Sequence, residues 1–433
     1  MNSGRGLTLI WNDRGTGTYA INVLTGALEA ALSGCDVEIR FVSKPAAIVS
    51  AIRAALKRDR RVLVGWSFYS PEFRTCSTEL EWIKRHIADP RVLHLAGGAH
   101  ATAEPEQTLR AGFDLVALGE GEKTLIEFVH RLLDGDDDRR LRGLASLDRG
   151  RYVSHGPGAR IGLDEFPPFA IAHRRFNPIE ITRGCIYACR FCQTPFMFKA
   201  RFRHRSVENI CHYVRVMKEH GLTDVRFISP TALSYGSTDE SVNLDKVEEL
   251  LASVRRVLGR EGRIFFGTFP SEVRPEHVTR EALMVLKKYV ANDNLVIGGQ
   301  TGSSRLLDLS RRGHTVEDIM TAVDISLEVG FLPNVDFIFG LPGETPGDVE
   351  ASLKLAERLA DMGARIHGHT FMPLPGTPFQ NAPPGTIHPE TQRRLDRLAT
   401  SRKLYGQWRR QMAIARDLAE MRAASNSRRR SAR

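Results

Sequence analysis

The sequence predicts an α/β protein in which a doubly wound parallel sheet is followed by a partial barrel and a C-terminal helical tail. Two observations support this fold class. Short apolar runs alternate with helical patterns through the first 145 residues and again from residue 176 onward, and such alternation is typical of parallel sheets whose strands are joined by helices. A charged, glycine-containing stretch at 132–140 separates the two series, so the chain of 433 residues is expected to form two domains.

The N-terminal series predicts five strands that are separated by helices. The segments 21–32 and 46–56 carry apolar residues at the spacing of one helix face. The expected strands are 7–11, 37–42, 61–68, 91–97 and 114–120. Residues 1–142 are therefore expected to form a Rossmann-like domain, whose ligands bind beyond the C-terminal ends of the strands. A hairpin and a proline-rich crossing segment are expected to link the domains over 143–175.

The second series predicts six strand–helix units over 176–385. The expected strands are 179–184, 224–230, 263–269, 294–300, 334–340 and 365–371. Six units fall short of a complete barrel, so we expect a partial (β/α)6 TIM-type barrel with its chemistry on the loops at the C-terminal strand ends. A long polar helix at 387–422 and a basic disordered tail are expected to close the chain over 386–433.

The net charge of +10 is concentrated near the C-terminus. Residues 402–433 contain ten Lys and Arg residues but only two Asp and Glu residues, so the rest of the chain is nearly neutral. Such a tail either attracts nucleic acid or another acidic partner, or is a solvated extension without a partner. No binding motif accompanies the tail, so the second interpretation is favoured and nucleic acid is not expected as a partner.

The sequence contains no recognisable membrane segment or secretory signal. No apolar run approaches the roughly 18 residues that a membrane-spanning helix needs, and the first residues lack the apolar region of a signal peptide. We therefore expect a cytoplasmic protein without membrane contact. Six cysteines in such a chain do not form a disulfide framework, which leaves reduced thiols available for a metal.

Three of the cysteines lie directly after the first strand of the predicted barrel. Cys185, Cys189 and Cys192 have C-x3-C-x2-C spacing. The remaining cysteines are isolated in the sequence: Cys35, Cys76 and Cys211. A structural zinc site is the ordinary alternative, but such sites are closed by four ligands and His204 is the nearest candidate for a fourth. A cubane iron–sulfur cluster held by three cysteines instead leaves one iron open, and catalysis needs an open metal position.

This cysteine motif, with Phe191 before its last cysteine and a partial barrel around it, resembles the radical S-adenosylmethionine (SAM) superfamily. The resemblance implies that Cys185, Cys189 and Cys192 hold a 4Fe-4S cluster and that Phe191 belongs to the cofactor site. It also implies that the open iron binds the amino and carboxylate groups of SAM. An electron from a flavodoxin- or ferredoxin-type partner would then lead to cleavage of SAM and release of a 5′-deoxyadenosyl radical.

Two further segments resemble the SAM-binding parts of this superfamily. In "GGQTGSSRLL", Gln300 and Ser303 are expected to contact the ribose and methionine parts, with strand-end capping as the alternative. In "DFIFGLPGET", Ile338 is expected to pack on adenine and Gly340 to allow close approach of the backbone. The Gly-Gly-Glu turn that the superfamily often carries after its second strand is replaced by "ISPTALSYG", so the residue that holds the methionine amine is not assigned.

Several charged side chains are expected at or after barrel strand ends, where a substrate should bind. They are Glu272, Arg274, His367 and His369. Salt bridging or fixing of loops is the alternative role for each of them.

The N-terminal domain resembles the cobalamin-binding domain that precedes the barrel in one subfamily of radical SAM enzymes. The resemblance rests on three strand-end segments, "GWSFYS", "AGGAHATAEPEQTL" and "ALGEGEKTL". The residues that it implies in cofactor binding are Ser67, Gly97, Gly98, Gly119, Glu120, Gly121 and Glu122. The Asp-x-His-x-x-Gly motif that supplies a lower cobalt ligand is absent, so His100 is interpreted as structural. The alternative is a degenerate domain that only supports the barrel.

Together, these resemblances predict a cobalamin-dependent radical SAM enzyme that methylates an unactivated carbon. Ring formation and rearrangement use the same radical and remain open. A second hypothesis is a radical SAM enzyme without cobalamin that modifies RNA or a small molecule, and a third is a non-catalytic cobalamin or metal sensor. The open-cluster motif argues against a sensor, and nothing in the sequence identifies the substrate.

Overall fold

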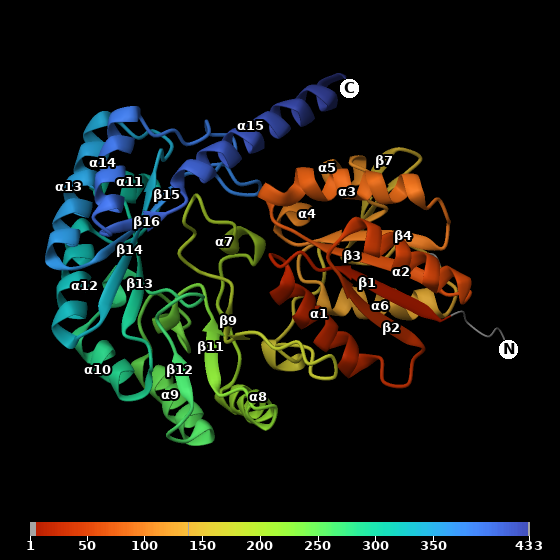
Figure 1. The fold of residues 1–433 in the computed structure, drawn as a ribbon, viewed down its shortest axis with the longest axis horizontal. Coiled ribbons are helices and arrows are strands. Elements are labelled where there is room, and N and C mark those ends of the chain that lie inside the picture. The colour runs from red at the N-terminus through yellow and green to blue at the C-terminus, as the bar shows by residue number, and fades with distance from the viewer. Residues whose placement is uncertain (1–5, 137, 432–433) are drawn as a thin grey trace. The chain divides into compact units, whose positions relative to one another are not determined.

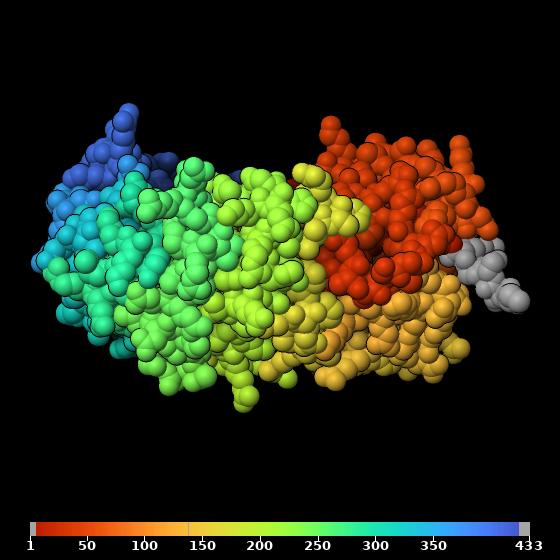
Figure 2. Space-filling model, turned by 90° about the horizontal axis from the view of Figure 1, so that it is seen from below, coloured from red at the N-terminus to blue at the C-terminus, as the bar shows by residue number. Residues whose placement is uncertain are grey.

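The computed structural model describes the backbone of residues 6–136 and 138–431 and the side chains as far as residue 423. The chain divides into two compact units, Met1–Asn177 and Pro178–Arg433. Each unit is an α/β structure with its own sheet and helices (Figure 1). Figure 2 shows the same chain in space-filling form, with the first unit in red to yellow and the second in green to blue.

The first unit is built on one seven-stranded sheet with the strand order β2-β1-β3-β4-β5-β6-β7. Its strands are β1 (Leu7–Asn12), β2 (Val37–Val42), β3 (Arg61–Ser67), β4 (Val92–Gly97), β5 (Leu115–Ala117), β6 (Leu144–Asp148) and β7 (Arg151–Ser154). Strands β1 to β5 pair in parallel, which confirms the predicted doubly wound sheet. Helix α1 packs against α6 and α2 packs against α3, as expected when helices cover the two faces of such a sheet.

The helices of this unit follow the strands in alternation. They are α1 (Thr18–Ala31), α2 (Pro45–Lys57), α3 (Phe73–His86), α4 (Ala99–Ala103), α5 (Pro105–Arg110) and α6 (Glu122–Leu133), with 3₁₀ turns η1 (Ser70–Glu72) and η2 (Leu163–Glu165). The core lies between the sheet and α1 and α6, where Leu9, Ile21 and Phe128 are almost fully buried. Apolar residues on one face of each helix therefore pack on the apolar strands, as the periodicity predicts.

The hairpin after residue 143 belongs to the sheet of the first unit. Strand β6 pairs antiparallel with β5 through Val116 and Ala145, and β7 pairs antiparallel with β6. The segment 143–175 was expected to be a separate link between domains, whereas the compact first unit extends to Asn177. The reason is physical: the edge of β5 offers unpaired backbone groups, and the hairpin satisfies them.

The second unit contains a curved series of parallel strands and one small antiparallel pair, formed by Thr182–Arg183 and Arg203–His204. Its strands are β8 (Ile179–Glu180), β9 (Thr182–Arg183), β10 (Arg203–His204), β11 (Asp224–Ile228), β12 (Arg263–Phe265), β13 (Asn294–Gln300), β14 (Leu332–Phe339), β15 (Arg365–Thr370) and β16 (Leu404–Gly406). The orders β8-β11-β12 and β13-β14-β15-β16 are joined by an isolated parallel bridge between Val273 and Ile297. All six predicted barrel strands are present, and the short strands β10 and β16 were not predicted from the sequence.

Most helices of the second unit alternate with these strands along the chain. They are α7 (Thr194–Met197), α8 (Val207–Glu219), α9 (Leu244–Leu258), α10 (Arg280–Tyr289), α11 (Ser304–Leu309), α12 (Val316–Val329), α13 (Pro346–Met362), α14 (Pro389–Thr400) and α15 (Trp408–Ser431), with 3₁₀ turns η3 (Ala232–Ser234) and η4 (Pro275–His277). Thr315 and Thr345 begin α12 and α13 as capping boxes, each accepting from the backbone N–H three residues later.

The C-terminal region differs from the prediction in two respects. One helix was expected over 387–422, but β16 separates α14 from α15, and Gly406 (φ +138°) pairs with Gly368 of β15. The backbone of α15 also continues to Ser431, where a disordered tail was expected, and residues 432–433 lie outside the described chain. In the part of the chain that the structure describes, no helix has both the length and the apolar composition for a membrane crossing.

Candidate functional site

The loop that carries the three cysteines follows β9 and is tied to other parts of the second unit. Gly184 begins it with φ +85°, and a Cβ atom there would lie 2.1 Å from the carbonyl oxygen of Arg201, so only glycine fits. Within the loop, the N–H of Cys192 donates to the carbonyl of Cys189 (3.1 Å). The N–H of Arg190 donates to the carbonyl of Ser310 (3.1 Å), which anchors the loop beside α11.

The cysteines of this loop are buried or half-buried, and they lie beside the buried guanidinium of Arg312. The guanidinium of Arg312 donates to Cys189 Sγ (3.2 Å) and to the carbonyl of Gly298 on β13 (2.7 Å). Burial raises the pKa of the Cys185 thiol to about 12 and also raises that of Cys192. Metal binding must therefore displace protons from Cys185 and Cys192.

A second layer of buried side chains supports Arg312 and the cysteine loop. The guanidinium carbon of Arg274 lies 3.5 Å from the ring centroid of Tyr187, and Arg274 also donates to Glu276 and to the Arg312 carbonyl. The Tyr187 hydroxyl lies 2.9 Å from His277 Nε2. Arg274 was expected near a substrate, but its observed partners fit the alternative, a salt-bridging role that fixes the loop.

The structure does not assemble the alternative zinc site. His204 uses both ring nitrogens elsewhere, at 3.0 Å from Thr182 Oγ1 and 2.7 Å from the Ser237 carbonyl. Cys211 lies on α8, which covers the outside of the barrel (Figure 1). A fourth protein ligand beside the three cysteines is therefore not provided by the residues that the sequence analysis considered.

The two apolar residues assigned to the SAM site lie against one buried cluster. This cluster consists of Leu306, Leu341, Phe371 and Phe379. Phe191, from the cysteine loop, and Ile338, from β14, are half-buried and pack against it. The fold therefore brings together residues that are far apart in the sequence, and it leaves each partly exposed, as a site for a flat apolar ring requires.

The polar residues assigned to the same site lie at the end of β13 and in the turn that leads from it to α11. Gln300 is buried and has φ +75°, a strained conformation for a residue with a side chain, at a point where the pairing with β14 changes register. Ser303 caps α11 by accepting from the N–H of Leu306 (3.3 Å), and its hydroxyl donates to Asp348 (2.5 Å). The capping role is therefore real, and contact with SAM stays a prediction for both residues.

Gly340 follows β14 and is constrained by the chain itself. Its φ is +75°, and a Cβ atom would lie 2.8 Å from the backbone nitrogen of Thr386. Its N–H donates to Glu344 Oε2 (2.7 Å). Burial raises the pKa of Glu344 to about 7. No role was predicted from the sequence for Glu344 or Arg312, although Glu344 lies in the segment 336–345 quoted above.

The strand ends of the first unit differ in how much room they leave for a ligand. Ser67 of β3 is paired with Gly97 of β4. A Cβ atom on Gly97 would meet Ala117 Cβ at 3.8 Å and the Trp66 carbonyl at 3.9 Å, so a side chain fits there. Gly98 has φ +92°, and its Cβ would lie 2.8 Å from the Phe68 carbonyl, so the protein backbone requires glycine at this position.

The segment after β5 is partly occupied by contacts within the protein. The N–H of Gly119 donates to Thr102 Oγ1 (3.1 Å), and buried Glu120 accepts from the N–H of Ile161 (3.3 Å). Gly121 precedes α6, and Glu122 is buried in its first turn. These contacts shape the strand end, and a cofactor-binding role for the four residues stays a prediction.

His100 is held in the interior of the first unit. Its ring stacks on Phe73 with 4.2 Å between centroids, and Nδ1 lies 3.1 Å from Ser70 Oγ. Burial lowers the pKa of His100 to about 4, so the ring is neutral. This packing fits the structural role expected from the sequence.

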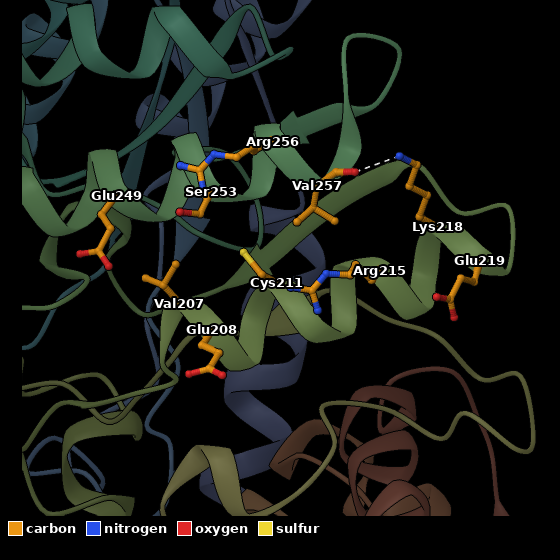
Figure 3. Close-up of a pocket in the computed structure, with 10 residues that line it drawn as sticks. All are labelled: Val207, Glu208, Cys211, Arg215, Lys218, Glu219, Glu249, Ser253, Arg256 and Val257. Carbon is orange, nitrogen blue, oxygen red and sulfur yellow. Dashed lines mark hydrogen bonds between the residues drawn. The ribbon is translucent and has the colours of Figure 1, made fainter.

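A surface pocket of about 800 Å³ lies between α8 and α9, on the outside of the barrel (Figure 3). Lys218 Nζ donates to the Val257 carbonyl (2.9 Å) beside it, and Cys211 lines it. The pocket contains none of the predicted site residues, so it is separate from the cysteine loop.

Comparison with protein families agrees with this division of the chain. Residues 16–129 match the B12 binding domain, and residues 179–356 match the radical SAM superfamily. The first match begins after β1 and runs from α1 through β5 and most of α6. The second covers β8 through much of α13, including the cysteine loop.

Curated relatives are distant and have various names. An uncharacterised protein of Methanopyrus kandleri is 26% identical over 68% of this chain and 63% of its own length. An uncharacterised methyltransferase of Pyrococcus horikoshii is 28% identical over 66% and 62%. A tRNA-2-methylthio-N(6)-dimethylallyladenosine synthase of Magnetococcus marinus is 27% identical over 72% and 68%. The chain thus spans less than two thirds of the length of the first two relatives.

Solved structures show the same fold. The radical SAM methyltransferase TsrM from Kitasatospora setae, with cobalamin and a [4Fe-4S] cluster bound, has a TM-score of 0.68 and 18% identity, over 87% of this chain and 74% of its own. The cobalamin-dependent SAM radical enzyme OxsB, with aqua-cobalamin bound, has a TM-score of 0.65 and 18% identity, over 84% and 53%. The chain therefore combines a B12-binding domain with a radical SAM domain.

Proposed function

We propose that this protein is a cobalamin-dependent radical SAM enzyme that cleaves SAM at a 4Fe-4S cluster and methylates an unactivated carbon. The observation that carries the proposal is the anchored loop with Cys185, Cys189 and Cys192 at the end of a barrel strand, in a chain that also has a B12-binding domain. Three thiolates hold a cubane cluster and leave one iron for SAM. The substrate is not identified by any feature of the site.

Different residues around the loop are proposed to bind SAM and to adjust the reduction potential of the cluster. Phe191 and Ile338 lie on the same apolar cluster, which suits adenine. For the ribose and methionine parts, Gln300 and Ser303 offer polar side chains. Gly340, in the loop after β14, allows close approach of the backbone. The buried charge of Arg312 beside Cys189 Sγ favours the reduced, more negative cluster.

Cobalamin would supply the methyl group from the C-terminal strand ends of the first unit. Space above Gly97 is compatible with close approach of a flat macrocycle, and Ser67 lies beside it in the sheet. Gly98, Gly119, Glu120, Gly121 and Glu122 complete the proposed rim. His100 is not proposed as a cobalt ligand, because its ring is buried between Phe73 and Ser70.

A second candidate function is a radical SAM enzyme that does not use cobalamin. The likeness to tRNA-2-methylthio-N(6)-dimethylallyladenosine synthases favours it, since these relatives align over about the same share of the chain. The B12-binding match over residues 16–129 favours the first candidate. In either case the cluster needs an electron, for which a flavodoxin- or ferredoxin-type donor in the cytoplasm is the proposed partner.

The cysteine loop predicts that anaerobically prepared protein binds about four irons per chain, as a cubane cluster requires. Cys185→Ala, Cys189→Ala and Cys192→Ala should each abolish iron binding, because two thiolates cannot hold the cluster. Cys211→Ala is the matched control and should keep its iron, which elemental analysis and absorbance would measure. Stoichiometric zinc without iron would contradict the assignment.

The contact between Arg312 and Cys189 predicts a shift in the reduction potential of the cluster. Hydrogen bonds to charged groups contribute about 1.5–3 kcal/mol, so Arg312→Gln should lower the potential by roughly 60–130 mV for a one-electron couple. A redox titration followed by electron paramagnetic resonance would measure it. Arg311→Gln, at the exposed neighbouring position, should leave the potential unchanged. An unchanged or raised potential in Arg312→Gln would refute the tuning role.

The proposed activity predicts that the reconstituted protein converts SAM to 5′-deoxyadenosine when a strong reductant is added, slowly without substrate. Chromatography of the products would measure this conversion. Cys189→Ala should form none, because it cannot hold the cluster. Failure of wild-type protein to cleave SAM under several reductants, with an intact cluster shown by spectroscopy, would count against both enzyme candidates.

The strand-end geometry predicts that hydroxocobalamin binds the first unit and that Gly97→Leu weakens binding at least about tenfold by occupying the open space above the strand. Gly97 is the informative position, because Gly98 cannot be replaced without straining the backbone. Absorbance titration would measure the affinity, and iron content should not change. Gly347→Leu, at an open glycine of the second unit, is the matched control. Absence of cobalamin binding in wild type would favour the second candidate function.

A further inference from the structure

A compact group of potential metal ligands lies on β14 and β15, apart from the cysteine loop. Asp336 is paired with His367 across the two strands, and His369 follows two residues later on the same face of β15. One ligand atom from each of the three side chains lies within 4.8 Å of the others. The sequence analysis named the two histidines as substrate candidates but missed Asp336, which only the strand register brings beside them.

The separations between these atoms match a metal site. Asp336 Oδ1 lies 2.8 Å from His367 Nδ1 and 3.6 Å from His369 Nε2, and the two nitrogens are 3.1 Å apart. Ligands at zinc-type bond lengths of about 2.0–2.1 Å in a tetrahedral arrangement lie about 3.3 Å from one another. The three atoms therefore form a triangle of the size that a single ion would hold.

Hydrogen bonding alone does not account for this triangle. Gln411 Oε1 accepts from the N–H of Thr370 (2.8 Å), and its Nε2 faces His369 Nδ1 (3.2 Å). A neutral His369 then carries its proton on Nε2, toward His367 Nδ1. His367 Nδ1 also faces the Asp336 carboxylate. If this nitrogen carries a proton, it donates to Asp336 but opposes the proton of His369. If it carries a lone pair, it accepts from His369 but opposes the carboxylate, so one of the two close contacts is repulsive in either case.

The surroundings favour a cation with an open coordination position. The Asp336 side chain is 10% exposed, whereas those of His367 and His369 are 29% and 27% exposed. The ring of Tyr405 on β16 stacks on His367 with 4.4 Å between centroids and fixes its orientation. Glu272, also named from the sequence, is half-buried and interacts electrostatically with Asp336 and His367, so it adds a second carboxyl group to these surroundings.

We propose that Asp336, His367 and His369 bind a divalent transition-metal ion of the Zn²⁺ or Fe²⁺ class inside the radical SAM barrel. Two imidazoles and one carboxylate are a donor set that these ions prefer, and three protein ligands leave room for a ligand from outside. Ile338 lies two residues from Asp336 on β14, so a bound ion would hold an oxygen- or nitrogen-bearing substrate near the proposed SAM site. The role toward substrate rests on the proposed function, but ion binding does not.

Metal binding by His369 would require Gln411 to change its hydrogen bonds. A His369 ring that binds metal through Nε2 carries its proton on Nδ1, which then needs an acceptor. Turning the Gln411 amide supplies that acceptor but gives up the bond from Thr370. Gln411→Glu supplies acceptors for both groups, so this variant should bind the ion more tightly, whereas a purely structural role for Gln411 predicts no gain.

The test uses the full chain with its reconstituted cluster, dialysed to equilibrium against Zn²⁺ and analysed for zinc and iron by mass spectrometry. We expect about one Zn²⁺ per chain beside the cluster iron. Asp336→Asn, His367→Ala and His369→Ala should each weaken zinc binding at least about tenfold, and Gln411→Glu should strengthen it about tenfold. Circular dichroism would show that the variants fold, and His212→Ala, at an exposed position on α8, is the matched control.

Zinc reports on the new site and cluster iron on the cysteine loop, because excess Zn²⁺ displaces Fe²⁺ from a histidine–carboxylate site. Loss of zinc in the Asp336 and histidine variants, with iron unchanged, would support the new site. Zinc binding that is absent in wild type, or that survives all three ligand substitutions, would overturn it. If the protein forms no cluster, but zinc binds to wild type and is lost only in these variants, the ion site is still supported and the proposed function is contradicted.

Discussion

The buried guanidinium of Arg312 connects the parts of the second unit that the proposed chemistry requires. The guanidinium donates to Cys189 Sγ on the loop after β9 and to the Gly298 carbonyl on β13. The backbone carbonyl of Arg312 accepts a hydrogen bond from Arg274. A cation in so dry a place is favourable only with several partners. The cysteine loop, the end of β13 and η4 are therefore positioned together, and the site behaves as one unit rather than as separate loops.

Parallel strand pairing explains why so many candidate residues converge. In each unit, the C-terminal ends of neighbouring parallel strands lie on one edge, so loops that are distant in sequence become neighbours. Phe191 and Ile338 meet on one apolar cluster for this reason. The same register places Asp336 beside His367 deeper in the barrel. Parallel strand pairing thus accounts both for the proposed cofactor-binding residues and for the pair formed by Asp336 and His367.

The fold was largely predictable because its strands are apolar runs bounded by turns. The prediction for 37–42 coincides with β2, and that for 294–300 coincides with β13. Strand β16 could not be predicted, since three residues in a polar stretch carry no periodic signal and gain their pairing only from β15. The hairpin was recognised, but its membership in the first sheet depends on the free edge of β5, which sequence does not show.

The candidate site was predictable where a local motif identifies it and not where it depends on long-range contacts. The spacing of the cysteines is visible over eight positions, whereas Arg312 meets Cys189 across 123 residues. Asp336 looks like an ordinary strand residue until the register with β15 is known. Gly97 and Gly98 look equivalent in sequence, and only their backbone conformations distinguish an open position from an obligatory glycine.

The antiparallel hairpin also changes how the first sheet meets its surroundings. With β6 and β7 added, the outermost strands of this sheet are β7 and β2. Strand β7 begins with exposed Arg151, and β2 carries Glu38 and Arg40, which pair with each other. Charged side chains on an outermost strand discourage a foreign strand from adding to it. Both outermost strands of the first sheet therefore discourage aggregation through the addition of a strand from another molecule.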